Sequence, residues 1–425
     1  MDLDNVSEDM GAKLQAILPA LGAPHGGSST DGVPPVDLSI AENELFRDEQ
    51  LGLIKEAIVD NLQLKDLAYP AGFGGEPELL TSLARFFNQY FRPSTAVDPS
   101  HIVATSGAGN ALDALLCAVC NEGDKVLVAG PCWEGFAPYF RIHANVTPIC
   151  VTASSLEAAT GMEIVEAITA AYHADLYPER IRAVVLTNPN NPLGRCYAPE
   201  ALRECLWFCH AHDLHFISDE VYALSAFRTD PGSPPFTSAL SLLDGEAGSD
   251  TSRVPPTMAS RVHVVWSLSK DFGCSGVRLG CIVTQANGAL RLGAGLASYW
   301  QVSSLASRLG TTLLGLPQLP ELVWRNSKAL GESYRLLTEG LEQVGIEYIP
   351  ATHGLFILAK IIPGGCTVQM ETAAVRSLAS MGLVVAQGQR FSPGVGQCGW
   401  IRITFATGAE KIQRALAVLA RFRYA

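Results

Sequence analysis

Short, uninterrupted apolar runs alternate with longer segments of helical character through the middle of the chain. Strands are expected at residues 125–129, 182–187, 215–218, 262–266 and 279–283, because these runs are short, apolar and separated by turns and helices. Continuous apolar runs are typical of parallel strands whose two faces are both covered by helices. The pattern therefore predicts an α/β fold around a mostly parallel sheet.

The segments around these runs complete the expected alternation. A turn followed by a helix is predicted over residues 103–119, and further helices over 199–212 and 410–422. In the C-terminal part, residues 354–359 and 400–405 are strand-like. The tail therefore predicts a second, smaller α/β unit.

The chain is long enough for two domains, at 425 residues. We expect residues 1–35 to form a flexible N-terminal segment, since they end in a stretch rich in Gly and Ser. A large domain at 36–310 and a smaller C-terminal domain at 311–425 follow, with the start of the large domain contributing to the small one. Residues 229–260, rich in Pro, Ser, Gly and Asp, are expected to be a long exposed insertion.

The charge balance excludes several classes of partner. The formal net charge is −12, which argues against non-specific binding of nucleic acid and against an anionic membrane surface. No stretch reaches the roughly 18 apolar residues of a transmembrane helix. The acidic N-terminus lacks the apolar run of a signal peptide. A cytoplasmic protein is expected.

The eleven cysteines are scattered along the chain. Cys117 and Cys120 form a C-x-x-C, but their neighbours indicate a buried helix face. Cys205, Cys209, His210 and His212 could suggest a metal site, yet the apolar residues around them and the absence of a second ligand pair favour core packing. We therefore expect reduced cysteines and no metal.

The most informative segment is 267–280, SLSKDFGCSGVRLG, which follows an expected strand. A lone lysine is usually a solvated surface charge. Lys270, however, lies among hydroxyls and glycines, where its amine could capture an aldehyde as an imine, and Arg278 and the serines could hold a phosphate. Together they predict pyridoxal phosphate (PLP) as the cofactor. Asn191 and Asp219 also follow strands, where parallel sheets bind ligands.

Four segments occur in the order 188–194 (NPNNPLG), 218–222 (SDEVY), the lysine segment and 399–406 (GWIRITFA). In this order they resemble the class I/II aminotransferases, PLP enzymes of fold type I. Residues 38–45 (LSIAENEL) resemble the 1-aminocyclopropane-1-carboxylate (ACC) synthase-like branch, and the chain is similar to fungal secondary-metabolite enzymes. The resemblance covers the chain from about residue 36 and implies a large domain with a seven-stranded-type sheet.

The resemblance implies roles around the cofactor ring. Asp219 would keep the pyridine nitrogen protonated, because an adjacent carboxylate raises the pKa of that nitrogen. Asn191 and Tyr222 would donate hydrogen bonds to the phenolate oxygen, and Trp133 would stack on the ring unless it is simply a core tryptophan. The expected phosphate ligands are the backbone of Ala108, Gly109 and Asn110 at a helix start and the side chains of Ser267, Ser269 and Arg278.

The resemblance also implies residues for the substrate and a partner. Arg402 would grip the substrate's α-carboxylate as a two-bond fork, unless it belongs to a structural ion pair. Glu42 and Asn43 match positions near the substrate. Tyr69 matches a tyrosine that reaches the phosphate of a neighbouring subunit, which implies a homodimer.

The implied activity is that of a PLP-dependent aminotransferase-type enzyme acting on an amino acid or an amino-acid-derived substrate in secondary-metabolite biosynthesis. Two related outcomes stay open, because the same residues serve them: β-elimination with thiol release by a carbon–sulfur lyase, and ACC synthase-like γ-elimination. A non-catalytic regulator with the PLP fold is the alternative from another class.

Overall fold

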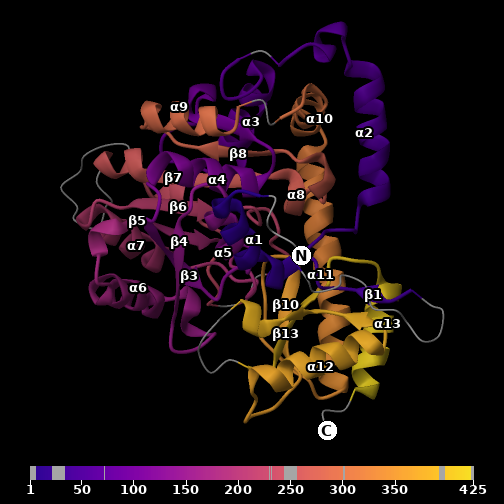
Figure 1. Ribbon diagram of the computed structural model, residues 1–425. Helices are drawn as coiled ribbons and strands as arrows, with labels where there is room; N and C mark the ends of the chain where they lie inside the picture. Colours follow the sequence, from indigo (N-terminus) through magenta and orange to yellow (C-terminus); the bar gives the residue numbers. More distant parts are fainter. Residues whose placement is uncertain are drawn as a thin grey trace.

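The computed structural model describes residues 6–21, 34–70, 72–228, 230, 232–243, 256–299, 302–391 and 398–422. A seven-stranded sheet lies at its centre, in the order β2-β8-β7-β6-β5-β3-β4 (Figure 1). The neighbouring strands are parallel except β8, which is antiparallel to both of its neighbours. The strands are β2 (Ile102–Thr105), β3 (Lys125–Gly130), β4 (Thr147–Thr152), β5 (Ile181–Thr187), β6 (His215–Asp219), β7 (Val262–Ser267) and β8 (Gly280–Val283).

The predicted α/β fold with a mostly parallel sheet is confirmed. The five expected strands are present as β3, β5, β6, β7 and β8. The expectation that Val103 begins a turn was wrong, because residues 102–105 form β2 before the turn and the helix. Strand β4 was not predicted.

Helices cover both faces of this sheet. Consecutive residues of one strand, such as Val184 and Val185, enter two different hydrophobic clusters, because successive side chains of a strand point to opposite faces of the sheet. This double burial explains the continuous apolar runs. The helices that line the two clusters are α3 (Pro77–Tyr90), α4 (Ala108–Val119), α5 (Phe136–Ile142), α6 (Met162–Ala174), α7 (Pro199–Ala211), α9 (Gly288–Ala297) and α10 (Ser304–Leu314).

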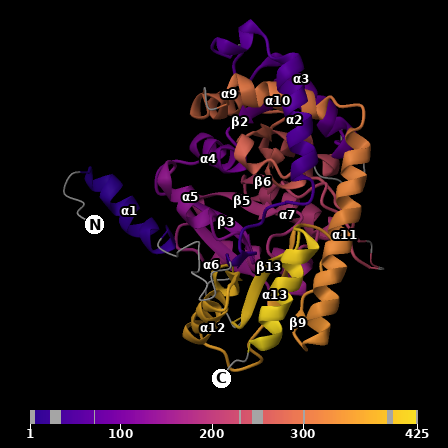
Figure 2. The ribbon, with the colours of Figure 1, turned by 90° about the vertical axis from the view of Figure 1, so that its right-hand side faces the viewer.

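A second, antiparallel sheet in the order β12-β13-β10-β9 forms what we call the C-terminal unit, together with α11, α12 and α13 (Figure 1). The long helix α11 runs alongside both sheets (Figure 2). The N-terminal part joins this unit as expected, since β1 (Val36–Asp37) pairs with β11 (Leu383–Val384). The other elements are β9 (Glu347–Tyr348), β10 (Phe356–Lys360), β12 (Ala386–Gln387), β13 (Trp400–Thr404), α11 (Leu319–Gln343), α12 (Val368–Ser380) and α13 (Ala409–Arg421). The domain boundaries at 36–310 and 311–425 stay predictions.

One expectation about loops needs correction. In the N-terminal segment, residues 8–21 form helix α1 (Glu8–Leu21), and the Gly- and Ser-rich stretch expected to be flexible lies within residues 22–33, outside the described part. The segment 229–260 is not simply an exposed insertion. Its short apolar run at 239–243 enters the core of the large sheet, and Ser238 donates a hydrogen bond of 2.6 Å to the buried Glu220. Residues 244–255 are outside the described part.

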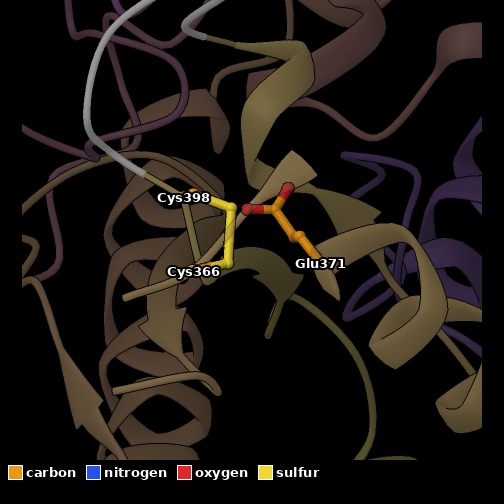
Figure 3. A group of neighbouring side chains, drawn as sticks. All are labelled: Cys366, Glu371 and Cys398. Atoms are coloured by element: carbon orange, nitrogen blue, oxygen red, sulfur yellow. A yellow bond between two sulfur atoms is a disulfide. The ribbon is translucent and has the colours of Figure 1, made fainter. Parts of the chain in front are cut away.

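The expectation of reduced cysteines is wrong for one pair. Cys366 and Cys398 form a disulfide with Cα atoms 5.5 Å apart, across 32 residues of sequence (Figure 3). Beside it, the carboxylate of Glu371 accepts backbone hydrogen bonds from Gln389 (2.8 Å) and Gly399 (2.6 Å). These contacts make the group of three side chains a structural clamp between α12 and the start of β13.

Within the part of the chain that the structure describes, no helix combines the length and apolar character that crossing a bilayer requires.

Breaking the disulfide should destabilise the fold. Cys366→Ser removes a cross-link that closes a loop of 32 residues, so the free energy of unfolding should fall by about 2–4 kcal/mol. Denaturant unfolding of the oxidised protein measures this change. Cys117→Ser, which alters an exposed free cysteine, is the control, and equal stability of the two variants would contradict the prediction.

Candidate active site

A cavity of about 730 Å³ lies where the carboxyl ends of the parallel strands meet the C-terminal unit. This volume is in the range of about 300–1,000 Å³ that small-molecule sites occupy. Thr187 ends β5, Asp219 ends β6, and Lys270 follows β7; all three line the cavity. The parallel sheet therefore gathers these residues as the sequence predicted for Asp219 and Lys270.

Lys270 lies on a one-turn helix, α8 (Leu268–Asp271), that begins directly after β7. Its Nζ donates a hydrogen bond of 2.6 Å to the carbonyl of Ala41. Burial lowers the pKa of this amine to about 8, and the nearby Arg402 cation acts in the same direction, while Glu42 and Asp219 oppose it. A considerable share of the amine is therefore neutral near pH 7.5, which is the form that attacks an aldehyde or accepts a proton.

Asp219 is fully enclosed, and burial raises the pKa of its carboxyl to about 7. Its Oδ1 has no hydrogen-bond partner among the described residues, and neither has the hydroxyl of Thr187. The two residues are register partners on neighbouring strands. Since a buried polar atom without a partner costs free energy, these atoms fit a ligand that offers a donor, as the protonated pyridine nitrogen of PLP does.

Arg402 projects from β13 and is also buried. It donates to Asn191 Oδ1 (2.9 Å) and to the carbonyl of Ser39 (2.5 Å), and its guanidinium lies 4.7 Å from the ring centre of Phe391. Its Nε has no partner in the described residues, and no carboxylate there forms an ion pair with it. The structure therefore offers no support for the alternative of a structural ion pair, and a carboxylate ligand fits the vacant donor.

Helix α4 begins at the cavity and carries no side-chain cap at its N-terminus. Gly107, with φ at 82°, precedes it, and a Cβ atom there would lie 2.5 Å from the guanidinium of Arg278. The glycine thus lets the cation approach the free amides of the helix start. Arg278 is held by the carbonyls of Ser275 (2.8 Å) and Ser106 (3.2 Å). Amides at a helix start beside a cation bind phosphate, so this end of the cavity fits the PLP phosphate.

The remaining cofactor residues divide into two groups. Ala108, Gly109, Trp133, Asn191, Tyr222, Ser267 and Ser269 line the cavity together with Lys270, Asp219, Arg278 and Arg402. The ring of Trp133 packs 5.3 Å from that of Tyr139. The side chain of Asn110 does not line the cavity and instead accepts the backbone N–H of Ser106 (3.0 Å), so only its own backbone N–H can serve the phosphate.

Contrary to expectation, the structure does not bring Glu42 or Asn43 into the cavity. Tyr69, which is expected to reach the phosphate of a partner subunit, does not line the cavity of its own chain. The buried amide of Asn43 turns away to donate to Asn326 on α11 (2.7 Å). Glu42 accepts from Ser275 Oγ (2.7 Å) and influences Lys270 only through its charge. The side chain of Tyr69 is 82% exposed.

Sequence reasoning missed part of the lining. Thr187 could have been predicted as a lining residue, because it is the last residue of an expected strand, but it was not singled out. Nothing in the sequence indicates that the backbone carbonyls of Ser39 and Ala41 face the cavity residues. The outer wall was missed altogether, and it comprises Tyr139, Thr372, Val375, Arg376, Ala379, Gln387 and Arg390.

Comparison with known proteins gives a consistent result. The family model for aminotransferase class I and II matches residues 34–419. The chain is 39% identical to the probable aminotransferase aclI of Aspergillus oryzae, over 95% of this chain and 94% of that protein. It is 31% identical to 1-aminocyclopropane-1-carboxylate synthase 1 of Oryza sativa, over 88% of this chain and 78% of that protein. An aspartate aminotransferase of Thermus thermophilus, solved with maleate, shares the fold with a TM-score of 0.75 at 22% identity, over 98% and 97% of the two chains.

The reactivity of Lys270 should depend on pH and on Arg402. Since the neutral amine attacks the aldehyde, the rate of PLP capture by cofactor-free protein should rise with pH and level off above about 8. Arg402→Met removes a cation that disfavours the ammonium form, so the pKa of Lys270 should rise and the profile should move to higher pH. Stopped-flow absorbance gives the rates. Arg335→Met, on the surface of α11, is the control, and an unmoved profile in Arg402→Met would refute the coupling.

Proposed function

Because the chain belongs to the class I and II aminotransferases, which are PLP-dependent enzymes, we propose that it transfers the amino group of an amino acid or an amino-acid-derived substrate. We place this reaction in secondary-metabolite biosynthesis. In support, a stretch that covers 60% of this chain is 44% identical to a part of the trimodular acetylaranotin synthesis protein of Aspergillus terreus. That part makes up 28% of the trimodular protein.

One observation carries the proposal: the amine of Lys270 shares a cavity with a carboxylate oxygen of Asp219 and with the buried cation Arg402. Among the described residues, that oxygen has no hydrogen-bond partner and Arg402 has no acidic partner. The three groups suit the anchoring aldehyde, the ring nitrogen and the substrate carboxylate. When bound, PLP supplies that aldehyde and an electron-poor ring that stabilises negative charge on the substrate's α-carbon.

The chain's own residues then divide the work. Arg402 holds the α-carboxylate, because its two outer nitrogens are already oriented by Asn191 and Ser39 while Nε stays open. The Lys270 Nζ accepts the α-proton, for which its pKa of about 8 is well matched near neutral pH. Asp219 becomes fully ionised when a cationic ring nitrogen faces it, since the opposite charge offsets the effect of burial.

Elimination is a second candidate. The 31% identity to the rice 1-aminocyclopropane-1-carboxylate synthase favours it, and the α-proton transfer to Lys270 is common to both reactions. A carbon–sulfur lyase activity would begin in the same way. The candidates differ only in the fate of the substrate after the proton has moved.

Lys270→Ala should abolish turnover, because it removes both the anchor and the proton acceptor. Bound PLP should also lose the visible absorbance of its lysine-linked form. The purified wild-type protein is assayed for 2-oxo acid, ammonia, thiol and 1-aminocyclopropane-1-carboxylate. A 2-oxo acid formed only when an amino acceptor is added supports transfer, whereas ammonia or thiol without an acceptor supports elimination. Undiminished turnover by Lys270→Ala would contradict the proposal.

A homodimer is part of the proposal. Large apolar side chains are exposed along α2 (Arg47–Asn61) and the short 3-10 helix after it (Leu64–Leu67): Val59 is 80% exposed, Leu64 88% and Leu67 76%. Leu296 on α9 is likewise 68% exposed. Such a surface is typical of a protein interface. Tyr69, directly beyond it in sequence, is the residue expected to reach the partner's phosphate.

The double variant Leu64→Asp, Leu67→Asp should be monomeric, because it places two carboxylates in the proposed interface. Light scattering should give twice the chain mass of 45.3 kDa for the wild type and the single chain mass for the variant. Leu176→Asp is the matched control, since Leu176 is 86% exposed on another part of the chain. A wild type of single-chain mass would disprove the dimer.

A cytoplasmic location stays a prediction. The disulfide between Cys366 and Cys398 is the observation against it, because cytosolic thiols are normally kept reduced.

A further inference from the structure

Lys270 lies on a helical turn that cannot hold its own position. Helix α8 comprises only Leu268–Asp271. A single helical turn has little stability of its own, because it fixes several residues for very few hydrogen bonds. The position of Lys270 must therefore be fixed by contacts between this turn and the rest of the fold.

The side chain of Asp271, the last residue of this turn, supplies such contacts. Its Oδ2 accepts the indole N–H of Trp266 (3.1 Å) and the backbone N–H of Leu224 (3.2 Å). Trp266 belongs to β7, and its buried ring packs 4.5 Å from the ring centre of Phe86. One carboxyl oxygen thereby ties the helical turn to an anchor in the core of the large sheet.

Leu224 connects the same oxygen to a second part of the active site. It ends the turn 221–224, which follows β6 and carries Tyr222. This turn is closed by the carbonyl of Tyr222, which accepts the backbone N–H (3.1 Å) and the hydroxyl (2.5 Å) of Ser225. Asp271 Oδ2 therefore joins the turn that carries Lys270 to the turn that carries Tyr222, and both of these side chains line the active-site cavity.

The carboxyl of Asp271 is not itself part of the cavity wall. Asp271 is 4% exposed and does not line the cavity of about 730 Å³. It borders a separate cavity of about 20 Å³, which has room for about one water molecule and not for a substrate. Asp271 can therefore act on the reaction only through the residues that it holds.

The charge state of the carboxyl agrees with a holding role. Burial raises the pKa of Asp271 to about 8, although the hydrogen bonds from Trp266 and Leu224 oppose this shift. The carboxyl is therefore mostly neutral at pH 7. Its Oδ1 has no hydrogen-bond partner among the described residues, so the neighbours use a single accepting oxygen. An asparagine amide offers the same oxygen in nearly the same shape.

We propose that Asp271 is a positioning residue for the PLP chemistry, because its Oδ2 holds Lys270 and Tyr222 at a fixed separation. Without this oxygen, two buried N–H groups lose their acceptor, and the two turns can shift relative to each other. The inference rests on the proposed function, in which Lys270 captures the aldehyde of PLP and Tyr222 donates a hydrogen bond to its phenolate oxygen.

The rate of PLP capture by cofactor-free protein tests the position of the amine. Asp271→Ala should slow capture about tenfold or more, since displacement of a reacting group by about 1 Å has effects of at least this size. Asp271→Asn should capture PLP at nearly the wild-type rate, because it keeps the accepting oxygen. Leu206→Ala, in the core-facing side of α7, is the control for a general loss of stability and should also react at nearly that rate. An Asn variant or a control as slow as Asp271→Ala would overturn the inference.

The pH titration of the visible absorbance reports on Tyr222. A weaker hydrogen bond from Tyr222 destabilises the phenolate form of lysine-linked PLP, so the midpoint should move to higher pH in Asp271→Ala and not in Asp271→Asn. Trp266→Phe removes one donor and leaves the carboxyl in place, so its midpoint should move in the same direction by a smaller amount. This second variant decides the question if Asp271→Ala does not fold. An unmoved midpoint in Trp266→Phe and in any folded Asp271→Ala would contradict the inference.

Hydrogen exchange separates the inference from the function on which it rests. Without PLP, the amides of residues 221–225 and 268–271 should exchange about tenfold faster in Asp271→Ala than in the wild type or Asp271→Asn, since a buried N–H has lost its acceptor. If the wild type forms no lysine-linked PLP while this contrast persists, the proposed function fails and the link between the turns stands. If PLP is captured and the contrast is missing, the link fails and the function stands.

Discussion

The burial of three ionisable groups around one cavity is the constraint on which the rest of the structure depends. Water is largely excluded from Lys270, Asp219 and Arg402. Burial raises the pKa of Asp219 and lowers the pKa values of Lys270 and Arg402, so it favours the neutral form of each group. Charges in such a place destabilise a fold unless they are matched. Here they are matched only in part, by Asn191, by backbone carbonyls and by one another. Among the described residues, Asp219 Oδ1 and Arg402 Nε have no hydrogen-bond partner. A cofactor and a substrate would satisfy these two atoms, so ligand binding would offset the cost that their burial has for stability.

Both sheets are needed to create this arrangement. The parallel sheet delivers Asp219 and Lys270 at its carboxyl edge, but Arg402 comes from the antiparallel sheet and reaches Asn191 across the junction. The clamp of Cys366, Glu371 and Cys398 ties the beginning of α12 to the residue before β13. It thereby helps to fix both walls of the cavity that belong to the C-terminal unit.

The sequence predicted most of what depends on local pattern. Five buried strands were predictable because both of their faces are covered, and Asp219 and Lys270 because each follows such a strand. Strand β4 escaped because it is an edge strand with a proline at 148 and partly exposed residues, so its apolar pattern is weak. The disulfide escaped because cysteines 32 residues apart carry no signal until the fold brings them together. Asn43 illustrates the opposite error: its motif was informative about the backbone near Lys270, but not about where the amide points.

The outer wall of the cavity shows why the substrate is harder to predict than the cofactor. The residues expected to hold PLP lie in short motifs at the ends of strands, whose positions the sheet dictates. Arg376 and Val375 instead belong to an ordinary amphipathic helix, and nothing in their spacing distinguishes a face that borders a cavity from a face that borders solvent. Only the docking of α12 on β12, through Gln387 and Thr372, turns that face toward Arg402.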